Sequence, residues 1–556
     1  MDNYAIADQL SLLAKLMDIH GENSFKSKSY SAAAFTLEKL PGEINSFSKE
    51  KIFSVRGIGE SVGKNIIEII ETGSMQQLQE LIKKTPEGVL EMMNIKGLGP
   101  KKINLLWKEL GIETIDDLQE ACNENIIASQ KGFGEKTQNK IVESIQFQHE
   151  AKGKYHYAKT EAFAEAFNQK LKIALPEKRF EMTGAFRRQL EIIETLDWVT
   201  TATSAELKKE LVTAQMQLVT DRDGMLILNA ENALLLRFFI SDQKHFATAL
   251  FETSCSDDFL NEWKSNFQTN TEAKNEEEIF ASAGLNFIPA FVRETKEVLH
   301  KPFSSTHKFV EVSSIKGLIH SHSNWSDGSN TIDEMAEALI GLGFEYLVLS
   351  DHSKAAYYAT GLHEEKIKQQ HQYIDALSKK LAPFKIFKSI ECDILSDGKL
   401  DYDDSVLSTF DLVITSIHSN LDMPEEKAMK RLLGAITNPY TTIMGHLTGR
   451  LLLKRNGYPV DHKTIIDACA ENNVAIEINA NPKRLDMDWR WIEYALKKNV
   501  LLSINPDAHT IEEFHNIKYG VLVAQKGGLT ADKNISSFSL KQFEFFLNET
   551  KKKKGI

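Results

Sequence analysis

The sequence predicts a multidomain protein with a helical N-terminal region, a mixed α and β middle region and a C-terminal α/β barrel. The chain has 556 residues, which is more than one domain of about 100–200 residues holds. In residues 1–150, apolar residues such as Leu10, Leu13 and Met17 recur at helical spacing. From about residue 316, short apolar runs alternate with helical stretches, a pattern typical of a parallel sheet or an α/β barrel.

Composition and charge exclude several classes of protein. The formal net charge of -12 excludes a protein that coats nucleic acid through bulk charge, so any such contact must be local. The sequence contains no apolar run of about 18 residues, so we expect no membrane span. The first residues do not have the pattern of a secretory signal. The four cysteines form no CxxC pair, which favours a reducing cytoplasm. We expect the lysine run 551–554 to be a solvated tail.

Three glycine turns punctuate the N-terminal region. Residues 55–59, 95–99 and 130–134 read VRGIG, IKGLG and QKGFG, and each precedes an expected helix that carries lysine. Glycine permits positive φ and close backbone approach, and N–H groups that open a helix form a phosphate site. The turns resemble helix-hairpin-helix motifs, which bind the DNA backbone without reading its sequence. Three ordinary helix–helix turns are the alternative. The candidate DNA contacts are Gly57, Gly59, Lys64, Gly97, Gly99, Lys101, Lys102, Gly132, Gly134 and Lys136.

The middle region mixes helices with β-rich runs. Residues 224–228 and 234–240 are predicted strands, and the polar stretch 268–278 is a predicted exposed loop. In the C-terminal region seven apolar runs are predicted strands, enough for a barrel. They span residues 317–320, 346–349, 386–390, 412–417, 442–444, 474–478 and 501–504.

Metal-binding residue types follow six of these seven runs. The carboxyl ends of barrel strands meet at one face, and that face carries the chemistry. In the triplets 320–322 and 507–509, residues i and i+2 of an extended strand point to the same side. Histidine with carboxylate suits Zn, Mn or Fe; Cys392 should face away from Glu391. Ordinary buried or surface histidines are the alternative. The candidate ligands are His320, His322, Asp327, His352, Glu391, His418, His446, Asp507 and His509.

This region resembles the PHP (polymerase and histidinol phosphatase) family of trinuclear phosphoesterases. The matching motifs are HSHS at 320–323, SDG at 326–328, SDHS at 350–353, GHLTGR at 445–450, EINANP at 477–482 and DAH at 507–509. The resemblance implies a distorted (β/α)7 barrel that holds three divalent ions (Mn²⁺, Zn²⁺ or Fe²⁺). Two departures, Leu318 and Leu447, stand where the family often has Asp and Pro; neither position is a ligand, so we expect altered metal tuning.

The resemblance also implies a role for each site residue. His320, His322, Glu391 and Asp507 would hold one ion, Glu391 would bridge to a second ion on His418 and His446, and Asp327, His352 and His509 would hold the third. We expect Glu391, Asp507 and His352 to act in catalysis. Arg450 and Arg484 are candidate clamps for the substrate phosphate, with a solvated surface role as the alternative for each.

The N-terminal architecture, over residues 1 to about 300, resembles a bacterial family X DNA polymerase, whose bacterial members typically carry a fused C-terminal barrel. Residues 25–33 look like the start of its DNA-end-binding domain, and residues 184–191 like the nucleotide-binding turn of its palm, with Gly184 and Arg188. Where the family has an Asp-x-Asp pair, this chain has Thr195 and Asp197, and Leu235 stands at the third carboxylate position. Two-metal nucleotidyl transfer needs these carboxylates, so we predict no template-directed synthesis.

The domain organisation follows from these segments. We expect a DNA-end-binding domain with the first hairpin at residues 1–80, a helical fingers-like region at 81–150, a degenerate nucleotidyltransferase palm and thumb at 151–300, and the PHP domain at 301–556. The leading prediction is a metal-dependent 3′-5′ exonuclease in DNA repair, with activity at abasic sites as a further option. The expected partner is DNA with gaps, nicks or 3′ ends, bound by a cytoplasmic, nucleoid-associated monomer. A small-molecule phosphatase of the histidinol-phosphate type and a non-catalytic DNA-binding scaffold are the alternatives.

Overall fold

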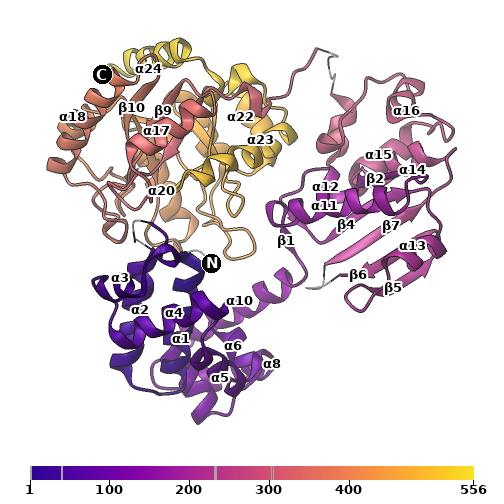
Figure 1. Cartoon of the computed structure of the whole chain (residues 1–556). Coiled ribbons are helices and arrows are strands. Elements are labelled where there is room, and N and C mark those ends of the chain that lie inside the picture. Colours follow the sequence, from indigo (N-terminus) through magenta and orange to yellow (C-terminus); the bar gives the residue numbers. More distant parts are fainter. Residues whose placement is uncertain (1–2, 39, 41, 231–233, 302–303, 305) are drawn as a thin grey trace. The chain divides into compact units, whose positions relative to one another are not determined.

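The computed structural model describes residues 3–38, 40, 42–230, 234–301, 304 and 306–556. The chain forms two compact units, Met1–Lys152 and Gly153–Ile556, whose elements are labelled in Figure 1. In the described part of the chain, no helix is both long enough and apolar enough to cross a membrane. The finer divisions expected near residues 80 and 300 remain predictions.

The first unit is helical, as predicted (Figure 1). Leu10, Leu13, Leu16 and Met17 lie on one face of the first helix and are fully buried in a core shared with the later helices. The helices are α1 Asn3–Ile19, α2 Ser24–Glu38, α3 Lys49–Ser54, α4 Glu60–Thr72, α5 Gln76–Lys84, α6 Glu87–Met92, α7 Pro100–Asn104, α8 Ile115–Asn123, α9 Ile126–Ser129 and α10 Glu135–Ala151.

The second unit begins with a mixed sheet whose strand order is β2-β4-β7-β6-β5. Both predicted strands are present, as β6 and β7, and β7 pairs in parallel with β4. The strands are β2 Phe180–Thr183, β4 Thr195–Thr200, β5 Gln217–Arg222, β6 Met225–Asn229 and β7 Leu235–Ile240; a separate short pair joins β1 Tyr155–His156 to β3 Ile192–Ile193. The helices are α11 Tyr157–Ala174, α12 Gly184–Arg187, α13 Ser204–Leu211, α14 Phe246–Thr253, α15 Asp257–Asn266 and α16 Glu276–Ser282.

The predicted exposed loop at 268–278 is wrong in its last three residues. Asn275 caps α16 by accepting a hydrogen bond from the Glu278 backbone N–H, so the helix starts at Glu276. The Glu276 side chain is buried and pairs with Arg293 and Arg187. A cap and a buried ion pair therefore turn a polar stretch into a helix start.

The C-terminal part forms a seven-stranded, all-parallel sheet in the order β14-β13-β12-β11-β10-β9-β8. A parallel bridge between Ser321 and Ala508 joins its two edges, so the sheet is a nearly closed barrel, as predicted. The strands are β8 Gly317–Ser321, β9 Tyr346–Leu349, β10 Lys385–Asp393, β11 Leu412–Ser416, β12 Thr441–Met444, β13 Ala475–Asn479 and β14 Leu502–Asn505.

Helices cover the barrel on the outside (Figure 1). Strand residues such as Leu347 and Ile390 pack outward with these helices in the largest apolar core, because both faces of a parallel sheet are buried. Their neighbours Ile319 and Val348 share a second core with Phe543 of the last helix. The helices are α17 Ile332–Gly341, α18 Glu364–Lys380, α19 Asp404–Leu407, α20 Glu425–Ile436, α21 His462–Glu471, α22 Ile492–Lys497, α23 Ile517–Lys526 and α24 Leu540–Lys554.

The lysine run at 551–554 is the last turn of α24, which corrects the expected solvated tail. Lys551 Nζ donates to the Phe410 carbonyl at 2.9 Å, and Lys554 Nζ donates to the Thr441 carbonyl. Burial lowers the pKa of Lys554 to about 8. Two of the four lysines thus fasten the helix to the barrel instead of extending into solvent.

Candidate metal centre

All nine predicted metal ligands meet at the carboxyl end of the barrel strands. The strand ends bring them there as expected. The prediction that residues 320–322 form a regular extended strand, with residues i and i+2 on the same side, is only partly right. His320 has a φ of +63° and sits at a register shift between β8 and β9, so the pair His320 and His322 is presented by a bulge rather than by a regular extended strand. Asp507, at the end of β14, also has positive φ.

Glu391 of β10 lies at the centre of the site. Its Oε1 is 3.3 Å from His320 Nε2, 3.2 Å from His418 Nε2 and 3.1 Å from His446 Nε2. Its Oε2 is 2.9 Å from His352 Nδ1. A carboxylate whose two oxygens face different histidines is suited to bridge two cations.

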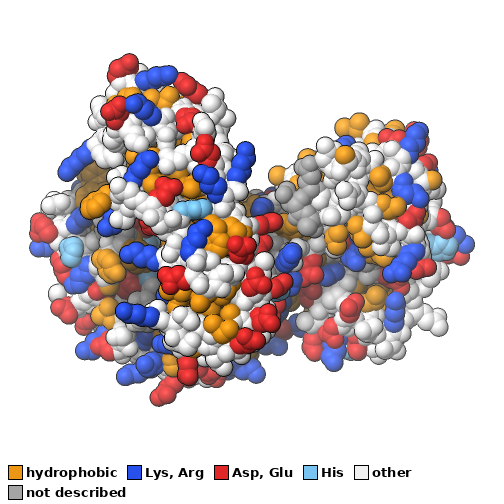
Figure 2. Space-filling model, turned by 90° about the horizontal axis from the view of Figure 1, so that it is seen from below, with side chains coloured by type: hydrophobic (Ala, Val, Ile, Leu, Met, Phe, Trp, Pro, Cys, Tyr) orange, Lys and Arg blue, Asp and Glu red, His pale blue; other side chains and the backbone are white. Residues whose placement is uncertain are grey.

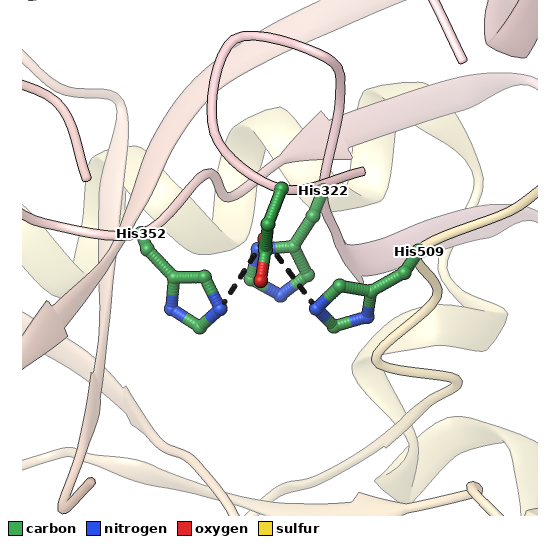
Figure 3. A group of neighbouring side chains, drawn as sticks. His322, His352 and His509 are labelled. Carbon is green, nitrogen blue, oxygen red and sulfur yellow. Dashed lines mark ion pairs between the residues drawn. The ribbon is translucent and has the colours of Figure 1, made fainter. Parts of the chain in front are cut away.

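Asp327 occupies the other side of the site. Its Oδ1 is 3.6 Å from His352 Nε2 and 3.6 Å from His509 Nε2. Figure 3 shows the imidazoles of His322, His352 and His509 converging, and dashed lines mark these ion pairs. The rings of His322 and His509 stack at 4.2 Å. One nitrogen from each histidine and one Asp327 carboxylate oxygen therefore lie within 4.8 Å of one another.

The donor set fits divalent metal ions. Glu391 is fully buried, yet neither of its carboxylate oxygens has a hydrogen-bond partner among the described residues, and His320 Nε2 and His322 Nδ1 also lack one. Buried polar atoms are normally hydrogen-bonded, so nitrogen and oxygen atoms that face one another at ion-pair distance without a hydrogen bond are placed as the ligands of a cation would be. Three groups have ligand atoms within 4.8 Å of one another: His320, His322, Glu391 and Asp507; His322, Asp327, His352 and His509; and His352, Glu391 and His418.

These groups resemble the expected three-ion arrangement but differ in detail. The first group is the predicted set, whereas the second adds His322 to the predicted three. The third pairs His418 with His352, and His446 lies beside it with its Nε2 3.2 Å from His418 Nε2. The number of ions and their identity stay predictions.

Charge in the site is strongly coupled. Despite burial, the neighbouring His418, His320 and His352 hold the pKa of Glu391 well below its usual range. Burial likewise opposes the charge on His320, yet Glu477 and Glu391 raise its pKa well above the usual value. Burial, with His352 and His509 close by, lowers the pKa of His322. The carboxylates of Glu391 and Asp507 are thus ionised, which is the form that binds a metal ion.

Glu477 of β13 supports the centre from behind, although it is not among the predicted ligands. Its Oε2 lies 2.6 Å from His320 Nδ1 and accepts a hydrogen bond from Asn505 Nδ2 at 2.8 Å. Its Oε1 accepts hydrogen bonds from the His446 backbone N–H and from Asn479 Nδ2. Such a partner fixes the ring orientation and tautomer of a ligand histidine. The alternation along β13 was the available signal, since residue 477 points to the same side as residue 479.

Asp351, which directly precedes His352, is a second supporting carboxylate that is not among the predicted ligands. Its carboxylate accepts hydrogen bonds from the Ser323 backbone N–H at 2.8 Å, from Ser323 Oγ at 2.8 Å, from Ser326 Oγ at 2.6 Å and from Gln370 Nε2 at 2.6 Å. These bonds fix the loop that carries Asp327. Burial raises the pKa of Asp351, against these bonds.

The two predicted phosphate-binding arginines have different surroundings. Arg484 Nε lies 3.6 Å from Asp507 Oδ2, at the edge of the metal centre. Arg450 instead donates to the Arg484 carbonyl at 2.8 Å, to Asp488 at 2.6 Å and to the Leu485 carbonyl. Its donors are engaged within the protein, so its place differs from the expected clamp, and its contacts hold the loop that bears Arg484.

The predicted vestigial polymerase site lies in the mixed sheet. Thr195 is directly opposite Leu235 across β4 and β7, where the resemblance places carboxylates. Asp197 is buried and receives two hydrogen bonds from Arg237, at 3.0 and 2.8 Å. Gly184 has a φ of +63°, and a Cβ there would lie 1.9 Å from the Asp197 carboxylate. The side chain of Arg188 pairs with Glu294 at 3.1 Å.

The three N-terminal glycine turns share one backbone geometry at their first glycine. The φ angles are +94° at Gly57, +93° at Gly97 and +93° at Gly132. Gly59 and Gly99 directly precede α4 and α7 with negative φ, whereas Gly134 precedes α10 with a φ of +74°. In each turn the residue between the two glycines is buried: Ile58, Leu98 and Phe133. The glycines on either side of it are exposed, so their backbone faces outward.

The lysines near these turns differ in availability. Lys101 and Lys136 are exposed, Lys64 pairs with Glu60 at 2.6 Å, and Lys102 donates to the Gly97 carbonyl at 3.1 Å. In the face shown in Figure 2, blue Lys and Arg side chains are interspersed with red Asp and Glu side chains. Any anion contact on this face therefore depends on local groups.

Known families match three parts of the chain. A helix-hairpin-helix domain matches residues 1–75, a SAM-like helix-hairpin-helix tandem matches 89–146, and a PHP domain matches 319–481. The DNA polymerase/3′-5′ exonuclease PolX of Bacillus subtilis (strain 168) is 34% identical over 97% of this chain and 98% of its own length. The chain belongs to the bacterial family X DNA polymerases with a C-terminal PHP domain.

Two more distant relatives each match less than half of the chain. A probable phosphatase of Thermoanaerobacter sp. (strain X514) is 26% identical over 41% of this chain and 91% of its own length. The DNA polymerase lambda of Rattus norvegicus is 26% identical over 21% of this chain and 20% of its own length.

Proposed function

We propose that the barrel hydrolyses DNA phosphodiester bonds as a 3′-5′ exonuclease in DNA repair. The observation that carries the proposal is that Glu391 and the other eight predicted ligands lie in one cluster that contains buried ligand atoms without hydrogen bonds. The Bacillus subtilis relative is named as a DNA polymerase/3′-5′ exonuclease, which supports the same activity. The three hairpin turns would hold the DNA backbone.

When bound, divalent ions lower the pKa of a water toward about 7 and accept phosphate oxygens. The residues of the chain supply the rest of the site. Glu391, Asp507 and His352 would hold the ions, and Glu477 fixes the His320 ring from behind. Arg484, 3.6 Å from Asp507, can pair with a phosphate oxygen at the edge of the centre.

We also propose that the polymerase core is inactive. In the described residues, every group of three or more His, Cys, Asp or Glu side chains able to hold a metal ion belongs to the barrel. Asp197 is a lone carboxylate already paired with Arg237, while Thr195 and Leu235 offer no second one. Two-metal nucleotidyl transfer needs several carboxylates at this position.

A small-molecule phosphatase activity of the same barrel is the second candidate. The similarity to the probable phosphatase of Thermoanaerobacter favours this candidate. The alignment covers 91% of that protein and 41% of this chain. Under this alternative the hairpin turns would have no part in turnover. Comparing the turnover of a small phosphomonoester with that of DNA discriminates between the two, because only the exonuclease should prefer DNA.

The direct test is digestion of 3′-labelled DNA in Mn²⁺, with DNA bearing an internal abasic site as a second substrate. We expect wild-type protein to release labelled nucleotide and His352→Ala to release far less. Absence of product, or product that His352→Ala does not change, would count against the nuclease. Purified protein that binds no Zn, Mn or Fe and gains no activity when they are added would instead favour a non-catalytic scaffold.

A further inference from the structure

Two adjacent tyrosines stand exposed beside the metal centre. Tyr357 is 85% exposed and Tyr358 is 57% exposed, in a short 3-10 turn, Tyr357–Ala359. Their rings meet edge to face at 6.0 Å, and the Tyr358 ring is 6.4 Å from the ring of the metal ligand His352. Neither tyrosine has a role in the chemistry described above.

The turn is held firmly although its tyrosines are exposed. The Ala355 backbone N–H donates to Asp401 at 2.6 Å, and Thr360 Oγ1 donates to the Ser326 carbonyl at 2.9 Å. Gly361 is buried, and a Cβ there would lie 1.8 Å from the Ser353 carbonyl oxygen. The backbone that presents the two rings is therefore ordered in advance, which lowers the entropic cost of binding a ligand on them.

We propose that Tyr357 and Tyr358 form a stacking platform for the unpaired base at the 3′ end of a DNA strand. This proposal rests on the proposed function and deepens it by naming the substrate: a 3′-terminal nucleotide whose base is free to stack. Aromatic side chains bind bases of any sequence by stacking, which suits an exonuclease that must accept every nucleotide in turn.

Distance and chemistry favour a nucleobase as the occupant. Successive nucleotides of a strand are about 3.4 Å apart along the helix axis, so a ring 6.4 Å from the His352 ring lies within about two nucleotides of the scissile bond. A group that rests on Tyr358 must share the site with the phosphodiester being cut. The base is attached to that phosphodiester through its sugar, whereas a small aliphatic phosphomonoester carries no group that would use the platform.

The first experiment compares two DNA strands, one intact and one whose 3′-terminal nucleotide lacks its base. For Tyr357→Ala and Tyr358→Ala we expect KM for the intact strand to rise about tenfold, with kcat and bound metal little changed. Tyr357→Phe and Tyr358→Phe keep the ring and should behave like wild type. All five proteins should process the strand without the terminal base equally poorly. The matched control is Phe545→Ala, because Phe545 is an exposed ring on α24 that lines a different pocket.

The second experiment separates the platform from hydrolysis. A strand with 3′-terminal 2-aminopurine and a non-hydrolysable terminal linkage should lose fluorescence on binding wild-type protein, but not on binding the double variant Tyr357→Ala/Tyr358→Ala. Quenching without any hydrolysis of ordinary DNA would overturn the exonuclease and leave the platform in place. Hydrolysis that is indifferent to both tyrosines and to the terminal base, or quenching that survives in the double variant, would overturn the platform.

Discussion

Arg237 holds Asp197 through two hydrogen bonds, from Nε to Oδ1 at 3.0 Å and from Nη2 to Oδ2 at 2.8 Å. A bidentate pair of this kind uses both oxygens that a magnesium ion would need. Across the same two strands Thr195 faces Leu235. The remaining carboxylate of the palm is therefore part of an internal ion pair, while the carboxylates of the barrel face one another and their histidines.

Replacing Glu477 tests how the metal centre is supported. The Glu477 carboxylate lies 2.6 Å from His320 Nδ1, so Glu477→Gln removes the negative charge that orients this ligand. We expect metal affinity or activity to fall about 10- to 100-fold, measured by metal titration and nuclease assay. Glu334→Gln, at the exposed start of α17, should change neither. Unaltered metal affinity in Glu477→Gln would show that His320 needs no such partner.

The hairpin turns predict a specific salt dependence of DNA binding. Lys101 is exposed at the start of α7, two residues after Gly99. If Lys101 neutralises one phosphate, Lys101→Ala should weaken duplex binding and reduce the slope of log K against log salt by about 0.9. Fluorescence anisotropy over a range of KCl concentrations measures this slope. Lys83→Ala, an exposed lysine at the end of α5, is the control; equal slopes in both variants would place the DNA contact elsewhere.

Part of the sequence interpretation follows directly from burial. The seven strands were predictable because parallel strands are apolar on both faces, and β9 Tyr346–Leu349 begins and ends where its apolar run does. The site was predictable because strand ends converge. The alternation along β13 signals on which side Glu477 lies, but its role and that of Asp351 depend on hydrogen bonds to residues far away in sequence. Arg450 and Lys554 carry charges that suggested solvent or substrate, yet their partners are carbonyl and carboxylate groups of the protein.

A buried ion pair within the second unit predicts a large effect on stability. Lys526 of α23 has a fully buried side chain, and its Nζ contacts Glu294 Oε1 at 2.9 Å and the Arg188 carbonyl at 2.7 Å. Glu294→Gln would remove the carboxylate that both this ammonium and the Arg188 side chain contact, at a cost of about 3–5 kcal/mol. Urea unfolding followed by tryptophan fluorescence measures it, since Lys526 lies over the Trp489 ring. Lys526→Met should cost less, because it removes the buried charge; the opposite order would contradict this account.

His371 predicts how stability depends on pH. Burial and the nearby Lys388 lower the pKa of His371 to about 4 from 6.5, and its ring packs edge-on against Phe410 at 4.8 Å. Between these two pH values the unfolded chain binds more protons than the folded one, so the contribution is present above pH 6.5 and is lost as the pH falls toward 4. His371→Phe should flatten the unfolding free energy over this window relative to wild type. His515→Gln, at an exposed position, should leave the wild-type slope in place.

The most direct test of the central claim, that the barrel holds the working active site, is one reaction that can report both activities. A 5′-labelled primer on a gapped template is incubated with Mn²⁺ and all four deoxynucleoside triphosphates. We expect wild-type protein and Asp197→Ala to shorten the primer equally and Glu391→Gln to leave it unchanged. Primer extension by wild-type protein that Asp197→Ala abolishes would contradict this claim.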